Sequence, residues 1–138
     1  MRTFELEVMD DGQSRVWQLA ANTIETHRQY SVTLMAGDSR SWAAESTDLF
    51  DCLLKVRREL DAGNIKLGCM GCREDTWASG MMRDMGQGLS VYLLKDAVEG
   101  QRPPQAGTFN PSPVADTVTV HEQMAWHQSW LDRRTNRQ

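Results

Sequence analysis

Cys69-Met-Gly-Cys72 is the first group of residues whose types and spacing could support chemistry. A CxxC pair can bind zinc or alternate between a dithiol and a disulfide. Tetrahedral zinc needs four ligands, and the other candidate ligands in the chain are Cys52, His27, His121 and His127. The last two are six residues apart, which would place them on different faces of a helix. We therefore predict no metal site and no cofactor.

A redox role for the CxxC pair would have its own structural requirement. Redox pairs usually stand at a helix N-terminus that lowers the pKa of one thiol, whereas Cys69 is the last residue of a predicted strand. Three cysteines, an odd number, also do not form a disulfide framework. We favour reduced, structural thiols over a redox pair.

A cluster of charges near Trp77 is the second candidate site. It comprises Arg73, Glu74, Asp75, Arg83 and Asp84. Two arginines and three acids could bind a charged ligand, or place a general acid beside an anion site. The alternative, which we favour, is that these charges pair with one another and with the loop backbone, and so stabilise an irregular segment.

Other motifs in the same region do not meet the requirements of known catalytic sites. Gly86-Gln-Gly88 lacks the third glycine and the following helix of a nucleotide-binding loop. Ser79 lacks the flanking glycines of a nucleophile elbow. No histidine can be assigned to a thiol or hydroxyl as its base. We therefore predict no catalytic residue, which favours a binding protein over an enzyme.

The elements that position these residues follow from hydrophobic periodicity. Residues 3–9 alternate apolar and acidic side chains, as a half-buried strand does, and an Asp-Gly turn follows them. Further strands are predicted at 15–20, 29–36, 41–46, 64–69 and 89–96. Short connections between the first four favour an antiparallel meander.

Two helices complete the predicted fold. Leu49, Leu53, Val56 and Leu60 form one apolar stripe, with Ser46 or Thr47 as the N-cap and Gly63 as a left-handed C-terminal residue. A last helix is predicted from Val120 to about Arg134, with a Thr119–Glu122 capping box. Residues 98–116 contain all four prolines and are predicted to cross the surface as a loop anchored by Phe109. We predict one α+β domain over residues 1–138, with an antiparallel sheet of five or six strands packed by two helices.

Bulk composition limits the partners. The net charge of −4 over 138 residues argues against nucleic acid, which usually requires a basic surface. No apolar run approaches the roughly 20 residues that span a bilayer, and the N-terminus carries acids where a signal peptide is apolar. We predict a cytoplasmic protein with no membrane or nucleic-acid partner.

The segment around Arg83 also carries a family resemblance. It reads SGMxRDMGxG over residues 79–88, leads into Val91-Tyr92, and is followed by a helix that contains Trp126 and Trp130. In these features the chain resembles small uncharacterised bacterial proteins. In size, charge and predicted architecture it is similar to immunity proteins, which neutralise secreted antibacterial toxins.

The resemblance implies a cytoplasmic protein that occludes a cognate toxin. An acidic inhibitor would be steered toward a basic toxin cleft. One candidate contact surface is the set of acids at the turns of the meander: Asp10, Asp11, Asp38 and Glu45. The other is formed by Asp75, Trp77, Arg83 and Asp84. A small enzyme or ligand-binding protein that uses the Arg/Asp cluster is the alternative. Two further alternatives are a hydrolytic immunity protein, which reverses the covalent damage done by a toxin, and a general interaction protein.

Overall fold

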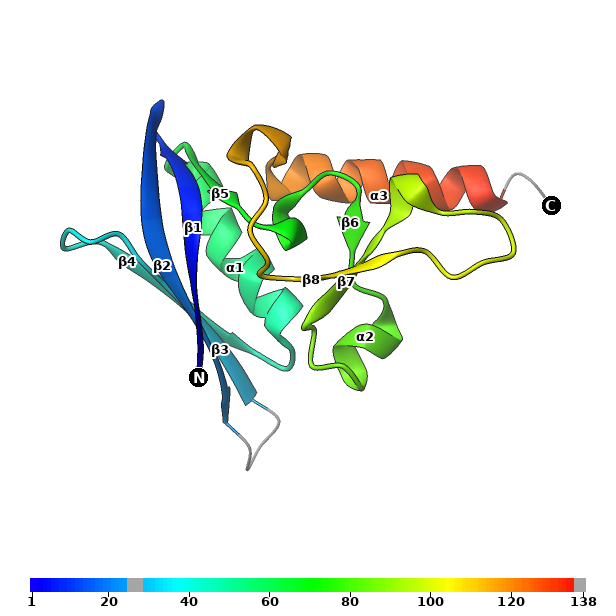
Figure 1. The fold of residues 1–138 in the computed structure, drawn as a ribbon, viewed down its shortest axis with the longest axis horizontal. Coiled ribbons are helices and arrows are strands. Elements are labelled where there is room, and N and C mark those ends of the chain that lie inside the picture. Colours follow the sequence, from blue (N-terminus) through cyan, green and yellow to red (C-terminus); the bar gives the residue numbers. More distant parts are fainter. Residues whose placement is uncertain (25–28, 136–138) are drawn as a thin grey trace.

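The first part of the chain is an antiparallel meander (Figure 1). The structure is a computed structural model, which describes residues 1–24 and 29–135. The strands of the meander are β1 (Arg2–Asp10), β2 (Gln13–Ile24), β3 (Gln29–Met35) and β4 (Ser41–Ser46). Asp11 and Gly12, at φ 49° and 85°, form the two-residue turn that the Asp-Gly pair predicted. β5 (Ile65–Gly68) pairs with β1, which gives a five-stranded sheet in the order β4-β3-β2-β1-β5.

Helix α1 (Leu49–Ala62) covers the apolar face of this sheet. The face is formed by alternate buried residues such as Leu6, Val8 and Leu19, and Leu53 packs against it from α1. Phe50 and Leu54 project from α1 into a second apolar cluster with Val91. α1 is therefore buried on two faces, and Figure 1 shows it between the two sheets.

The ends of α1 correct two details of the sequence analysis. Its N-cap is Asp48, whose Oδ1 accepts the Asp51 N–H at 2.9 Å, and not Ser46 or Thr47. Gly63 has φ −96°, while Asn64 adopts the left-handed conformation at φ 58°. Asparagine tolerates this conformation better than other non-glycine residues, so the chain reverses one residue later than predicted.

A second, three-stranded sheet has the order β6-β7-β8. Its strands are β6 (Thr76–Trp77), β7 (Ser90–Leu93) and β8 (Gln105–Gly107). We had predicted residues 89–96 as part of one sheet with the meander. That sheet cannot extend past β5, because the Ser112 N–H donates to the Gly68 carbonyl at 3.1 Å and Pro111 forms a bridge with Cys69. Through this single bridge the proline-rich segment covers the edge of the sheet, with Phe109 buried as its anchor. The segment is not the continuous loop that was predicted, because it contains β8.

Short helices connect these strands. They are the 3-10 turns η1 (Met70–Cys72), η2 (Leu94–Asp96) and η3 (Val114–Asp116), and the α-helix α2 (Gly80–Asp84). Ser79 begins α2 by accepting the Met82 N–H at 3.2 Å. The α+β class and the five-stranded antiparallel sheet are confirmed, and the described residues form three α-helices instead of the two that were predicted.

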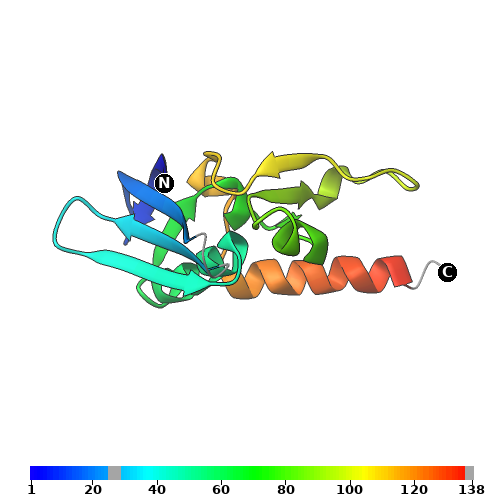
Figure 2. The same cartoon turned by 90° about the horizontal axis from the view of Figure 1, so that it is seen from below.

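The last helix, α3 (Val120–Thr135), runs along the second sheet (Figure 2). Its predicted capping box is present, because Thr119 Oγ1 accepts the Glu122 N–H at 3.2 Å and Glu122 Oε1 accepts the Thr119 N–H at 3.1 Å. Within the described ranges, no helix has both the length and the apolar character for crossing a membrane.

Candidate functional site

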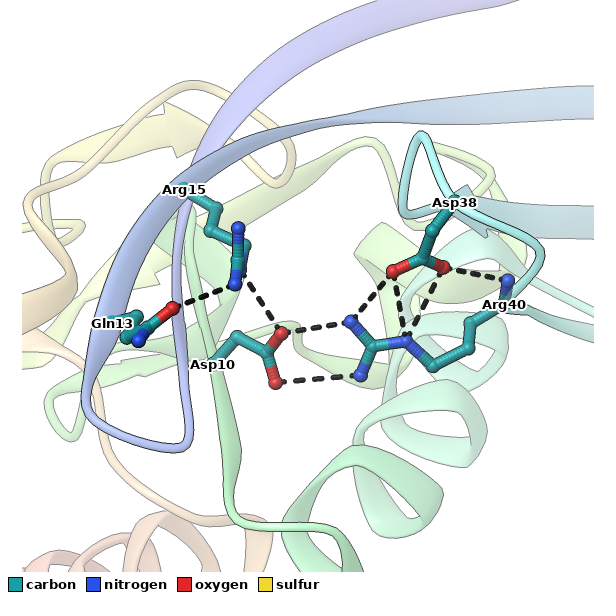
Figure 3. A network of polar contacts seen from close by, with 5 residues as sticks. All are labelled: Asp10, Gln13, Arg15, Asp38 and Arg40. Carbon is teal, nitrogen blue, oxygen red and sulfur yellow. Dashed lines mark hydrogen bonds and ion pairs between the residues drawn. The ribbon is translucent and has the colours of Figure 1, made fainter.

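The acids at the turns of the meander belong to an ion-pair network (Figure 3). The Arg40 guanidinium lies between Asp10 and Asp38, with Nη2–Oδ2 distances of 2.8 and 2.9 Å, and Arg15 Nε lies 3.2 Å from Asp10 Oδ2. The hydrogen bond from Arg40 is the main reason that the pKa values of Asp10 and Asp38 lie below the usual range. Their carboxylates are therefore already paired with arginines.

Arg40 also has a packing role in this network. Its guanidinium lies 5.2 Å from the ring centroid of Trp17 and 5.8 Å from that of Trp42, and the two rings stack on each other at 5.4 Å. The network thus covers one end of the core beneath the first sheet. Asp10 and Asp38 therefore have a structural role, which is to hold Arg40 against the two tryptophans.

The other two predicted acids of the meander, Asp11 and Glu45, are not part of this ion-pair network. Asp11 is exposed, and its Oδ1 accepts the Asn64 side chain at 3.3 Å, which ties the first hairpin to the turn after α1. Glu45 is exposed at the opposite end of β4, where its backbone carbonyl accepts Lys55 Nζ at 3.0 Å. The structure therefore brings Asp10, Asp11 and Asp38 to one end of the sheet, and Glu45 to the other.

The two arginines of residues 73–84 have different kinds of partner: one pairs within this segment and the other pairs with α1. Arg73 Nε lies 3.1 Å from the buried Asp75, which is the local pairing that we predicted. Arg83 instead reaches α1, with Nε 3.0 Å from Asp48 and Nη2 3.3 Å from Asp51. Asp84 is exposed on α2, and the ion pairs of the described residues do not include it.

The SGMxRDMGxG segment docks on the N-terminus of α1 through Arg83 and its last glycine, Gly88. Gly88 has φ 75°, and a Cβ atom there would lie 2.6 Å from the Phe50 nitrogen. The preceding Gln87 carbonyl accepts the Leu49 N–H at 2.9 Å. These contacts position α2 beside α1. They do not involve Met81 and Met85, whose side chains are 71% and 81% exposed.

An open groove of about 400 Å³ lies between α3 and the second sheet. We call it the aromatic groove, because its lining includes Trp77, Tyr92, His127 and Trp130. The His127 ring stacks on Trp77 at 4.5 Å and lies 6.3 Å from Trp130. A second hollow of about 460 Å³ continues from it along residues 97–103, and the two share Pro103, Trp130, Leu131 and Arg134.

Two arginines line the groove. The guanidinium of Arg83 is already paired with Asp48 and Asp51 of the same chain, whereas that of Arg134 lies 4.6 Å from the Trp130 ring centroid. Burial lowers the pKa of His127, which also lines the groove, so the imidazole is neutral at pH 7 and packs as an aromatic ring.

Sequence reasoning located part of this groove and missed the rest. Trp77 and Arg83 were predicted together, and both line it. His127 was considered as a possible zinc ligand, whereas its half-buried ring forms part of the groove wall. Trp130 and Arg134 were not proposed as site residues; their i, i+4 spacing was the available signal. His27 lies outside the described residues.

The CxxC pair is buried, as predicted for structural thiols. Cys69 Sγ and Cys72 Sγ lie 3.3 Å apart. Among the described residues, no three His, Cys, Asp or Glu side chains are grouped closely enough to hold a metal ion.

A scan against protein-family models finds no model that matches this chain, and no curated protein matches its sequence. The resemblance of residues 79–92 to small bacterial proteins therefore stays a prediction.

Proposed function

We propose that this chain is a stoichiometric protein-binding protein whose partner docks in the aromatic groove. The observation that carries this proposal is the composition of the groove, where Trp77, Tyr92, Trp130 and Arg134 line one open surface. Tryptophan, tyrosine and arginine supply most of the residues that dominate binding energy at protein interfaces.

Exposed apolar side chains at the groove and on α2 support a protein partner. Leu131 lines the groove and Val98 lines the hollow that continues from it, and 39% and 58% of their surface is exposed. Met81 and Met85, on the helix α2 that supplies Gly80 and Arg83 to the groove, are 71% and 81% exposed. Methionine adapts its shape to a partner, and contiguous exposed apolar residues are typical of interaction surfaces. The acids of the meander turns are less suitable anchors, because Asp10 and Asp38 are already paired with arginines.

We further propose that the partner is a cognate bacterial toxin, which this chain neutralises by occlusion in the cytoplasm. The supporting features are the net charge of −4, the length of 138 residues and the likeness to immunity proteins. The acidic surface would accelerate encounter with a basic toxin cleft, and the aromatic groove would then hold the complex.

Growth rescue tests this function. The chain is expressed together with the toxin encoded by the adjacent gene, and the complex is examined by gel filtration. We expect the wild-type chain to restore growth and to co-elute with the toxin. Absence of both rescue and complex would contradict the immunity function.

Variants then locate the contact surface. Trp130→Ala should weaken the complex at least tenfold, a loss of about 1.4 kcal/mol or more. The matched control is Val16→Ala, which alters a 68% exposed apolar residue on the first sheet. Equal affinities for the two variants would place the contact surface elsewhere.

A small anionic ligand is the second candidate occupant. It is favoured by the position of Arg83 and Trp77 on one groove of about 400 Å³, within the usual size range of ligand pockets. The two carboxylate partners of Arg83 make it the weaker proposal. Titration with phosphate- and carboxylate-bearing metabolites would test it, with Arg134→Ala as the variant that should lose binding.

A further inference from the structure

The two thiols of the CxxC pair are held against each other by the surrounding backbone. Cys69 follows β5, and the Cys72 N–H donates to the Cys69 carbonyl at 3.0 Å. The Met70 and Gly71 N–H groups donate to the Asn110 and Thr108 carbonyls, each at 2.8 Å. This arrangement fixes the turn on both sides and places the sulfur atoms 3.3 Å apart.

A buried arginine lies next to this turn. Arg57 on α1 is only 2% exposed. Its guanidinium donates to the Gly71 carbonyl at 3.3 Å, to the Val118 carbonyl at 2.8 Å and to Gln123 Oε1. All three acceptors are neutral. In the part of the chain that the structure describes, no carboxylate lies within 4 Å of Arg57.

An anion near Arg57 would lower the cost of burying its charge. Arginine stays protonated in proteins, and a buried charge without a counter-charge is costly. Asp61, one turn further along α1, is an acid on the same helix, and its Oδ2 accepts the Val120 N–H at 2.9 Å. The two thiols also lie in the field of Arg57, whose positive charge favours the ionised form of each.

The directions in which the two pKa values shift are those of a thiolate that accepts a hydrogen bond from the other thiol. Burial raises the pKa of Cys72, but the hydrogen bond from Cys69 and the positive charge of Arg57 outweigh it, so this pKa lies below the ordinary value. The same hydrogen bond, together with burial, raises the pKa of Cys69. Cys72 is thus the sulfur that ionises first.

We propose that Cys69 and Cys72 form a redox-active dithiol, with Cys72 as the attacking sulfur and hydrogen peroxide as its oxidant. Both thiols are buried, so a molecule close to the size of water is the expected substrate, and bulky disulfides are not. This role differs from the structural one that the sequence favoured, and it does not depend on the proposed partner.

The proposed reaction converts two thiols and one hydrogen peroxide molecule into one disulfide and two water molecules. The Cys72 thiolate attacks one peroxide oxygen, the O–O bond breaks, and hydroxide leaves as Cys72 becomes a sulfenic acid. Cys69 then loses its proton and attacks the Cys72 sulfur; the S–O bond breaks and a second hydroxide leaves. The Cys69 proton and one proton from solvent convert the two hydroxides to water. The sulfurs give up two electrons to the peroxide, and their separation closes to about 2.05 Å.

Cys52 provides an internal control. It is also buried, with its thiol donating to the Tyr30 carbonyl at 3.3 Å. Burial and the nearby Asp48 and Asp51 raise its pKa to about 12, so it remains a thiol at neutral pH. A reagent that simply reached buried sulfur would not distinguish Cys52 from Cys72.

The experiment measures thiols and mass after oxidation of the full chain. The folded protein is treated with hydrogen peroxide, denatured, and labelled with N-ethylmaleimide. We expect a loss of two hydrogens, one label per chain located on Cys52, and recovery of three labels after reduction. Oxidised glutathione should react at least tenfold more slowly than peroxide. Three labels after peroxide, or oxidation of Cys52 as fast as Cys72, would overturn the proposal.

Two variants assign the attacking sulfur. In Cys69→Ser the sulfenic acid has no neighbouring thiol to condense with, so dimedone, added together with denaturant after the peroxide is removed, should trap it on Cys72. In Cys72→Ser, Cys69 should react at least tenfold more slowly than Cys72 does in Cys69→Ser. Circular dichroism establishes that each variant is folded; if one is not, peptide mapping of the wild-type chain with limiting peroxide and dimedone decides. Sulfenic acid found first on Cys69 would contradict the assignment.

Discussion

Arg83 illustrates how a residue can carry the signature of a site and still have an internal role. Its side chain is 29% exposed and pairs with Asp48, which is 5% exposed, and with Asp51. In Arg83→Ala the buried Asp48 carboxylate would lose its cation while it still caps α1. We expect the free energy of unfolding to fall by roughly 1–3 kcal/mol, as measured by urea denaturation.

Asp84 is the matched control for Arg83, because it is the adjacent charge on α2 and is exposed. Asp84→Ala should change the free energy of unfolding by no more than about 0.5 kcal/mol. If the two variants were equally stable, the pairing of Arg83 with α1 would contribute nothing measurable, and its position on the aromatic groove would be the better explanation.

His127 should make stability depend on pH. Burial against Trp77 lowers its pKa below the usual 6.5. In the unfolded chain it takes up a proton as the pH falls through about 6.5, whereas the folded chain resists. This contribution to stability is therefore present above pH 6.5 and is lost as the pH falls toward the folded pKa. Between pH 7.5 and pH 5.5, the midpoint temperature of thermal unfolding should fall further for the wild type than for His127→Gln.

Individual residues were predicted well where one local rule decides their position. The Thr119–Glu122 capping box and Phe109 as an anchor are examples, and both are confirmed. Three contacts could not be predicted because they join residues 30 or more positions apart: Arg83 with Asp48, Arg40 with Asp10, and Arg57 with Val118. Side-chain spacing along the sequence carries no information about such pairs.

At the scale of elements, the SGMxRDMGxG segment depends on the close approach of Gly88 to α1. In Gly88→Ala a Cβ would be placed 2.6 Å from the Phe50 nitrogen, at a φ of 75° that side chains rarely adopt. We expect this variant to lose roughly 1–3 kcal/mol of stability, as measured by urea denaturation. Rearrangement of α2 should accompany the loss.

Gly80 is the control within the same segment. A Cβ at Gly80 would meet no atom within 4 Å, and it is the first residue of α2. Gly80→Ala should leave stability unchanged or raise it by up to about 1 kcal/mol. A loss in Gly80→Ala equal to that in Gly88→Ala would mean that the segment is sensitive to any side chain, and not to its docking on α1.

Element length separates what was predicted from what was not. β1 to β4 and α1 show clear periods of two and 3.6 residues, and each was predicted. β6 has two residues, β8 has three and α2 has five, which is too short for a period to be visible. These elements are fixed by contacts with β7 and α1. The second sheet, and with it the aromatic groove, could therefore not be derived from local pattern.

At the scale of the whole molecule, α1 joins the two sheets into one unit. Leu53 and Val56 pack against the first sheet, while Phe50 and Leu54 pack with Val91 of the second. Phe50 is fully buried. Because loss of either sheet would expose one face of α1, we expect both to unfold in a single cooperative transition.

Hydrogen exchange in increasing urea measures this coupling directly. The slowest amides of β2 and of β7 should have the same free energy of opening. Phe50→Leu, which removes three buried carbon atoms without introducing a polar group, should lower both values equally, by about 1 kcal/mol or more. If β7 opened at a lower free energy and Phe50→Leu affected it alone, the second sheet would be a separate unit. The aromatic groove would then rest on a part of the molecule that opens while the first sheet stays folded, and partner binding would have to stabilise that part as well as fill the groove.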